Sequence, residues 1–285
     1  MFFSVIPFTH SIWIQPLLYA WGDISEGEIE IGSIVEIPYG HFCENGIIAW
    51  IYSDSPIDPT SESFSRIKTI QRIITSKKLI APYQVNMICE ISSRYMIPIH
   101  RVLGIFLPKP ILSRLEKKNY EQIQNQEINY KNKKKWAIHI VKDGIVTPQI
   151  VTKYLQWPTV VILPDDFAMK PYQSMYKDIQ DVLFVTNDMT DTKRAKAWID
   201  ITNGTFSIIY WTRKILYYNL SKYKNLIYIE DALGPDYWHY PIRIHYNDIL
   251  RIFSKVNPWI QLTILTSIPC LSTLSYFRDF TIKNI

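Results

Sequence analysis

The sequence predicts two folded parts of different class, an α+β domain followed by an α/β domain. Three observations predict this: a pair of strand-like segments, a helix-like segment after it, and short apolar runs that later alternate with helical stretches. At 285 residues and 47% hydrophobic composition, the chain can bury a core in each part. The patterns give a small β-barrel-like domain with helices over 1–110, a basic polar linker over 111–135, and a parallel sheet covered by helices over 136–285.

The strand pair lies within Ile31–Tyr52. Polar and apolar residues alternate over 34–37, and residues 47–51 are continuously apolar, which is typical of a half-buried hairpin in a small barrel. Pro38-Tyr39-Gly40 predicts the turn between the strands, and Asn45-Gly46 predicts a second break.

Helices and a linker are expected next. The segment from Met87 to Pro108 repeats apolar residues at helical spacing and closes with Leu107-Pro108, which predicts a helical pair. Residues 113–135 are polar and charged, and residues 108–136 hold 8 Lys or Arg against 3 Asp or Glu. We expect a solvated connector or a short exposed helix, whose basic end is a candidate phosphate contact.

Beyond the linker, short apolar runs are each long enough for one buried strand: Trp136–Val141, Val160–Leu163, Val182–Val185, Phe206–Tyr210, Leu226–Ile229 and Leu262–Leu265. Helix-compatible stretches separate them at 147–156, 174–180, 190–200 and 246–255. Strands that alternate with helices predict a parallel sheet with helices on both faces.

Composition narrows the function classes. The net charge of +5 is compatible with nucleic-acid binding, but residues 1–107 hold 7 Lys or Arg against 10 Asp or Glu, so charge alone does not indicate DNA binding there. Cys43, Cys89 and Cys270 have no disulfide or zinc-ligand spacing. No apolar run approaches the ~20 residues of a membrane span, and the first twenty residues lack a signal-peptide pattern. We expect a cytoplasmic protein with no membrane contact and no zinc site.

The N-terminal pattern resembles a known domain. The hairpin, then Arg66-Ile67-Lys68-Thr69-Ile70, then the helical pair closed by Leu107-Pro108 are similar to the 3′-DNA-binding domain of the primosomal protein N′ (PriA) family of replication-restart helicases. The resemblance covers about the first 110 residues.

The resemblance implies a pocket that captures the last base of a 3′ strand. Its base-contacting segment corresponds to Leu17, Leu18 and Tyr19. Tyr19 keeps an aromatic ring, for which base stacking and core packing are both open, and Leu18 stands where a base-reading Asp would be. Tyr39-Gly40 matches the family's Phe-Gly turn, and Lys68 matches a lysine expected to contact phosphate. A pocket that keeps its shape but lacks the base-reading Asp is expected to capture a 3′ end more weakly and with less dependence on the base.

The C-terminal part resembles the first RecA-like lobe of the same helicases. Five elements have counterparts in the same order: Val160–Asp165 with Lys170-Pro171, Ile208–Arg213, Asn225–Asp231, Arg243–Asp248 and Leu265–Pro269. The resemblance implies a truncated relative, because the second lobe and the cysteine-rich zinc insertion of the full-length helicase have no counterpart in these 285 residues.

The nucleotide site that this resemblance implies is degenerate. A phosphate-binding loop needs glycines, a lysine for charge and a Ser or Thr for magnesium. Within 139–148 only Thr147 keeps its place; Val146 stands where the lysine would be, and two of the three glycine places hold branched residues. At the acidic motif two carboxylates remain, followed by Ala232-Leu233. The residues that would mark the degenerate site are Lys142, Gly144, Thr147, Glu230 and Asp231.

From this site we expect no catalytic residue, no competent binding of ATP or Mg²⁺, and two solvated carboxylates at a strand end. The leading hypothesis is a DNA-binding protein that recognises forked or single-stranded 3′-ended DNA in replication restart without its own ATPase. Replication-restart proteins and single-stranded-DNA-binding protein are the expected protein partners. Two alternatives stay open: a divergent ATP-dependent 3′–5′ helicase completed by a partner chain, and a non-catalytic interaction scaffold of the replisome.

The tryptophans prompt a separate hypothesis. Trp50, Trp157 and Trp211 fall where the family would have glycine, and the chain holds only 9 Gly. Because Trp is sterically awkward in a tight turn, we interpret some of these positions as misread UGA codons for glycine.

Overall fold

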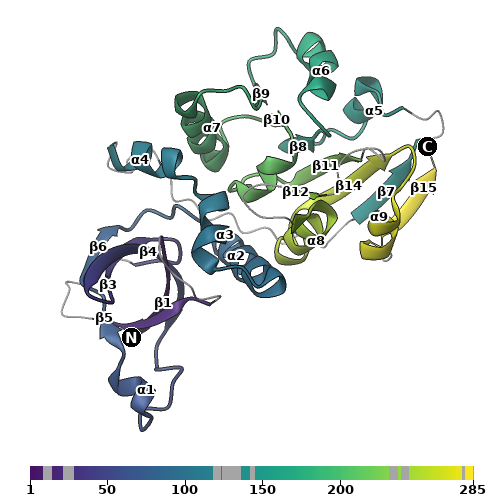
Figure 1. Cartoon of the computed structure of the whole chain (residues 1–285). Helices are drawn as coiled ribbons and strands as arrows, with labels where there is room; N and C mark the ends of the chain where they lie inside the picture. Colours follow the sequence, from purple (N-terminus) through teal and green to yellow (C-terminus); the bar gives the residue numbers. More distant parts are fainter. Residues whose placement is uncertain are drawn as a thin grey trace. The chain divides into compact units, whose positions relative to one another are not determined.

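The structure, a computed structural model, consists of two compact units, Met1–Gln126 and Glu127–Ile285 (Figure 1). It describes residues 1–8, 15–21, 29–117, 123, 136–141, 145–230, 237–238, 244–277 and 280–284. A mixed sheet with helices lies in the first unit and a parallel sheet with helices in the second, so the predicted succession of α+β and α/β layouts is confirmed.

The first unit contains a six-stranded mixed sheet that curves into a barrel-like shape (Figure 1). Its strands follow the spatial order β5-β2-β1-β4-β3-β6. Their bounds are β1 (Phe2–Pro7), β2 (Leu17–Ala20), β3 (Ile34–Tyr39), β4 (Phe42–Tyr52), β5 (Lys68–Thr69) and β6 (Arg72–Thr75). The predicted hairpin is confirmed as the antiparallel pair β3–β4, in which Tyr39 is opposite Phe42.

One short segment supplies both outer strands of this sheet. β5 pairs with β2 and β6 pairs with β3, although only Ile70 and Gln71 separate β5 from β6 in the chain. The amide of Ile70 donates to the carbonyl of Ala20 at 3.0 Å, and the amide of Gln71 donates to the carbonyl of Glu36 at 3.0 Å. The two edges of the sheet are therefore brought together, which leaves few open edge groups.

The predicted break at Asn45-Gly46 is wrong, because both residues lie inside β4 and continue the ladder with β3. Gly46 serves a close approach of two strands instead. A Cβ at this position would lie 2.6 Å from Cγ1 of Val5 and 2.9 Å from the carbonyl oxygen of Ile6. Glycine is thus required by the packing of β4 on β1 rather than by a turn.

The helices of the first unit are α1 (Glu62–Ser65), α2 (Pro82–Tyr95), α3 (Ile99–Phe106) and α4 (Lys109–Lys117). The predicted helical pair is confirmed as α2 and α3, and α2 begins earlier than expected because Pro82 occupies its first turn. Met96 ends α2 in the left-handed conformation with φ 53°. The expected linker differs at its start, where α4 buries Ile111 and Leu115.

The second unit is built on seven parallel strands in the order β15-β7-β14-β11-β8-β10-β9. Their bounds are β7 (Trp136–Ile140), β8 (Thr159–Ile162), β9 (Val182–Phe184), β10 (Ile208–Trp211), β11 (Asn225–Glu230), β14 (Gln261–Thr266) and β15 (Thr281–Asn284). All six apolar runs predicted as strands are confirmed. A separate small pair joins β12 (Tyr237–Trp238) to β13 (Ile244–His245).

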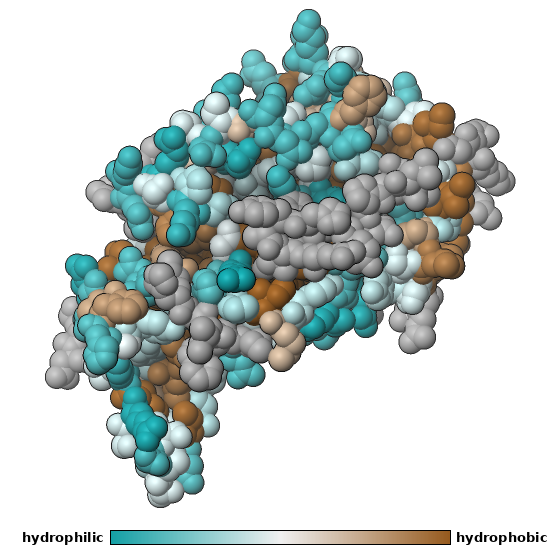
Figure 2. Space-filling model, in the orientation of Figure 1, coloured by the Kyte–Doolittle hydropathy of each residue, from teal (hydrophilic) through white to brown (hydrophobic). Residues whose placement is uncertain are grey.

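The helices of this unit are α5 (Pro148–Thr152), α6 (Lys170–Met175), α7 (Asp191–Asn203), α8 (Tyr246–Val256) and α9 (Leu271–Tyr276), with 3₁₀ turns at Phe167–Met169 and Arg213–Tyr217. The stretches at 147–156, 190–200 and 246–255 thus hold helices, but the helix expected at 174–180 is wrong, since α6 ends at Met175. α7 buries Trp198 and exposes Lys193, consistent with the hydrophilic surface over α6 and α7 in Figure 2.

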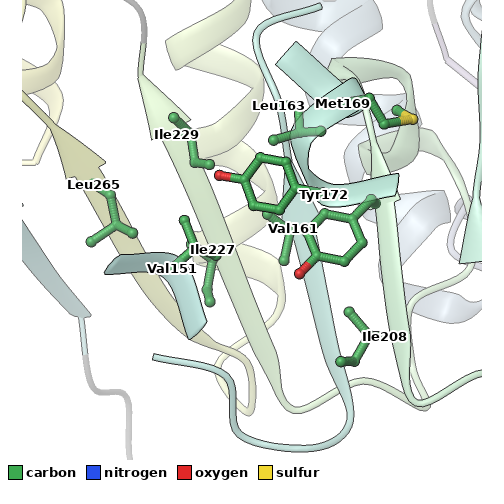
Figure 3. Close-up of a cluster of buried hydrophobic side chains, with 10 residues drawn as sticks. Val151, Val161, Leu163, Met169, Tyr172, Ile208, Ile227, Ile229 and Leu265 are labelled. Carbon is green, nitrogen blue, oxygen red and sulfur yellow. The ribbon is translucent and has the colours of Figure 1, made fainter. Parts of the chain in front are cut away.

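The core of the second unit packs around aromatic rings on the sheet (Figure 3). The Tyr210 ring lies 4.9 Å from that of Tyr172 and is stacked on Phe184 at 5.1 Å between ring centroids. Aliphatic residues from α5 and four strands surround these rings: Val151, Val161, Leu163, Ile208, Ile227, Ile229 and Leu265.

The structure does not support the steric argument that Trp50, Trp157 and Trp211 occupy positions that require glycine. Met96 is the non-glycine residue with positive φ in the described chain, so Trp50, Trp157 and Trp211 all have backbone conformations open to any side chain. Trp211 is 2% exposed and lies against Tyr218 with 4.5 Å between ring centroids. Its indole is therefore part of the core.

The crowding at Gly46 generates a stability prediction. Gly46→Ala should lower the free energy of unfolding by about 1–3 kcal/mol, because a methyl group there overpacks against Val5 and Ile6. Gly104→Ala is the matched control, since its Cβ would meet nothing within 4 Å and it lies on helix α3; it should be neutral or gain up to about 1 kcal/mol. Urea denaturation followed by circular dichroism measures both. Equal stability of the two variants would contradict the packing argument.

Candidate DNA-end site and degenerate nucleotide site

The turn of the β3–β4 hairpin forms the centre of the candidate DNA-end site. Gly40 has φ +62°, a conformation that disfavours side chains, and a Cβ there would meet nothing within 4 Å. Tyr39 and Phe42 flank the turn with their ring centroids 5.7 Å apart. Phe42 is 50% exposed, which leaves an aromatic surface open to solvent beside the turn.

Lys68 lies against this turn. Its Nζ donates a hydrogen bond to the Gly40 carbonyl oxygen at 3.2 Å, across 28 residues of sequence. The contact exists because Lys68 begins β5, which pairs with β2 in the curved sheet. The lysine side chain is exposed, so the ammonium group remains accessible while one of its three hydrogens is directed to the turn.

Tyr19 supports the site from inside the barrel. It is opposite Lys68 in the β2–β5 register, is 4% exposed, and belongs to the barrel core with Phe3 and Val35. Its hydroxyl donates to the Pro38 carbonyl at 3.3 Å. Burial, together with nearby Tyr39, raises the Tyr19 pKa to about 12, so the phenol stays neutral. Of the two roles left open, the structure favours core packing over base stacking.

The side chains of Leu17 and Leu18 point to opposite faces of the sheet. Successive side chains of a strand point to opposite faces, so Leu17 shares the face of Tyr19 and packs against the barrel core, whereas Leu18 points to the other face. The predicted residues that lie together are therefore Tyr39, Gly40 and Lys68 at the surface with Tyr19 beneath them. Leu18 does not stand beside Tyr19 as a replacement base reader.

Sequence reasoning missed Phe42, which flanks the turn, and Arg72 of β6, the strand beside β3. Phe42 could have been predicted from the sequence, because it is an aromatic residue that follows the predicted turn and is close to Tyr39 in the chain. Arg72 forms a bidentate pair with Glu36, with Nε–Oε2 2.9 Å and a second nitrogen–oxygen distance of 3.0 Å. Hydrogen bonding to Arg72 lowers the pKa of Glu36. Since Arg72 already has a carboxylate partner, Lys68 is the better cation for a phosphate.

The predicted phosphate loop is only partly described. Lys142 and Gly144 lie outside the described residues. Thr147 is half-buried at the start of α5, where its carbonyl accepts from the amides of Ile150 and Val151. Ile145 is 70% exposed, and Val146 packs against the sheet core. The place expected to hold a lysine is thus an apolar packing position.

Glu230 ends β11 as a buried residue, 5% exposed, so the expectation of a solvated carboxylate is wrong for it. Its carboxylate accepts from Cys270 Sγ at 3.0 Å, from the Cys270 amide at 3.4 Å and from the Thr273 hydroxyl. Nδ2 of Asn247 donates to Ser272 Oγ at 2.8 Å and to Thr273 Oγ1 at 3.0 Å. Asp231 lies outside the described residues. The described acid of the motif is therefore held by internal donors.

Among the described residues, no group of three or more His, Cys, Asp or Glu side chains is placed to hold a metal ion. No described helix has the length and apolar character needed to cross a bilayer.

Comparison with known proteins concerns the first unit. Residues 8–108 match the family model of the PriA 3′DNA-binding domain (3′BD), whereas no curated protein matches the chain. This match confirms the resemblance drawn for the N-terminal part, and the resemblance of residues 136–285 to a helicase lobe stays a prediction. The chain is thus similar, over residues 8–108, to the 3′DNA-binding domain of PriA.

Proposed function

We propose that this protein binds forked or single-stranded DNA at a free 3′ end in replication restart, through the first unit and without an ATPase of its own. The observation that carries the proposal is the contact of Lys68 with the Gly40 turn, within the residues that match the 3′DNA-binding domain. It joins an accessible cation, an open glycine turn and an exposed aromatic ring in one place.

Each group has a role that its chemistry supports. The ammonium of Lys68 attracts a backbone phosphate near the strand terminus. The glycine turn lets a nucleotide approach the backbone closely, because no Cβ occupies that space. Phe42 provides a ring for stacking on a base, an interaction that every base accepts. None of these contacts reads a base edge, so we expect end recognition with little sequence preference.

The second unit is proposed to be a degenerate first RecA-like lobe. Its support is the parallel sheet together with the five ordered resemblances, and the proposed lack of ATPase activity rests on two local features. Val146 is half-buried and packs against the core where a phosphate-binding lysine is needed. Glu230 is buried, and its Oε1 accepts from Cys270 Sγ and the Thr273 hydroxyl while its Oε2 accepts from the Cys270 amide, so both oxygens that magnesium would need already have donors. Replication-restart proteins and single-stranded-DNA-binding protein are the proposed protein partners.

The phosphate role of Lys68 is tested by salt-dependent DNA binding. Lys68→Ala should weaken binding to a fork with a free 3′ end by about 3–10-fold and reduce the log–log salt slope by about 0.7, the value for one single-strand phosphate contact. Lys109→Ala removes an exposed lysine just outside the matched residues and serves as control. Fluorescence anisotropy with free and 3′-phosphorylated forks measures both effects. Equal affinity for free and blocked ends, unchanged in Lys68→Ala, would favour the scaffold alternative.

Stacking by Phe42 gives a larger and salt-independent effect. Phe42→Ala should cost ~1–3 kcal/mol of binding free energy, about 5–150-fold in the dissociation constant, with an unchanged salt slope. Phe167→Ala, at a phenylalanine that is 75% exposed in the second unit, should leave affinity unaltered. The same anisotropy titrations report both variants. If Phe42→Ala binds DNA with wild-type affinity, the Phe42 ring does not contact DNA.

The degenerate nucleotide site predicts no magnesium-dependent ATP binding by the purified chain, with or without fork DNA. Equilibrium dialysis with labelled ATP measures this directly. Saturable binding that Thr147→Ala abolishes and Thr152→Ala preserves would instead support the helicase alternative, because only Thr147 stands at the loop's magnesium-binding place.

A further inference from the structure

A pocket of about 780 Å³ opens on one face of the parallel sheet in the second unit. It lies over β7, β14 and β15, and the residues that follow α5 form its side. Its volume falls in the range of about 300–1,000 Å³ that small-molecule sites occupy. The candidate DNA-end site is built from residues of the other unit.

The strand register explains the floor of the pocket. Ala137 on β7, which lies between β14 and β15, is paired with Thr263 on β14 and with Thr281 on β15, so three small residues form one row across these strands. In the next row Leu265 belongs to the core that Val151 of α5 covers. Helix α5 therefore covers the sheet toward the carboxyl ends of the strands and leaves the row of Ala137, Thr263 and Thr281 open.

The walls of the pocket are positively charged and rich in donors. Lys153 follows α5 and Lys283 lies on β15, where it is paired with His139. His139 is 8% exposed, and its Nδ1 shares a hydrogen bond of 3.1 Å with the Tyr154 hydroxyl, which fixes the imidazole in the wall. The described lining residues include no Asp or Glu. Burial and the facing Lys283 lower the pKa of His139, as expected where cationic groups are gathered.

The pocket is separate from the degenerate nucleotide site. Glu230, Thr266 and Thr147 lie at the carboxyl edge of the sheet, where strands of this kind present their ligands. The pocket extends from Gln261, the first residue of β14, to the row of His139 and Lys283, which is one residue before Thr266 and therefore faces the opposite side of the sheet from it. A ligand held here would lie on the other face of the sheet from the side chains of Glu230 and Thr266.

We propose that this pocket binds a phosphorylated small molecule, with the ammonium groups of Lys153 and Lys283 on its phosphate. Two cations and the hydroxyls of Thr263, Thr281 and Tyr154 match an anion that carries several acceptor oxygens. The volume exceeds that of a phosphate group, so an organic portion lies over the remaining wall, which Gln156 and Gln261 line.

Titration calorimetry of the full chain with inorganic pyrophosphate, in a magnesium-free buffer of low ionic strength, tests the proposal. We expect saturable binding that weakens at least tenfold in the double variant Lys153→Gln/Lys283→Gln. The double variant Lys193→Gln/Lys255→Gln removes two exposed lysines from α7 and α8 and should bind within twofold of wild type. Absence of binding to the wild type, or equal weakening in both double variants, would overturn the proposal.

Further variants locate the bound anion. Ala137→Leu should abolish binding by filling the floor, with its fold verified by circular dichroism, and retained binding would contradict the assignment. Loss of binding in Thr147→Ala would place the anion at the nucleotide site and overturn it as well. A third result would also contradict the proposal. If Lys153→Gln/Lys283→Gln loses affinity for single-stranded DNA but keeps its affinity for pyrophosphate, the two lysines bind a DNA strand and not a small molecule.

Discussion

Pairing of residues 68–75 with both edges of the first sheet is the constraint on which the candidate DNA-end site depends. The amides of Ile70 and Gln71 donate to strands that are far apart in the sheet order, and the barrel-like curvature follows from these bonds. Lys68 reaches the Gly40 carbonyl only because this segment passes the hairpin turn. A loose segment would leave the same residues in the chain but would separate the cation from the turn.

In the second unit, two residues of the proposed nucleotide-site motif take part in internal packing and hydrogen bonding. The proposed resemblance matches Glu230 to a magnesium-binding acid, yet its carboxylate is buried and accepts from Cys270 and Thr273. Val146, which is half-buried, likewise packs against the core. Burial of a carboxylate is costly unless donors satisfy it, so the hydrogen bonds that stabilise this strand end also compete with a metal ion. Retained acidity in a motif is therefore a weak sign of retained chemistry.

Much of the fold was predictable from the sequence because its patterns are local. The hairpin, the helical pair and six parallel strands follow from apolar periodicity. Features that depend on distant partners were not predictable: Gly46 resembles a turn residue, but its lack of a side chain serves the approach of β1. Tyr19 could not be assigned to surface or core, since strand alternation gives two faces without saying which is inside. The exposure of Phe42, which makes it a candidate for stacking, depends on the folded hairpin. The pocket lined by Lys153 and Lys283 could not be predicted because it depends on the pairing of β7 with β15.

The central claim is that the hairpin turn and the segment beginning at Lys68 together hold a 3′ DNA terminus. Hydrogen–deuterium exchange of the full chain, with and without an oligonucleotide bearing a free 3′ hydroxyl, tests it most directly. We predict that protection on DNA binding concentrates in residues 39–42 and 68–75, and that it falls when the 3′ end carries a phosphate. Protection confined to the second unit, or equal protection by the blocked oligonucleotide, would contradict the account.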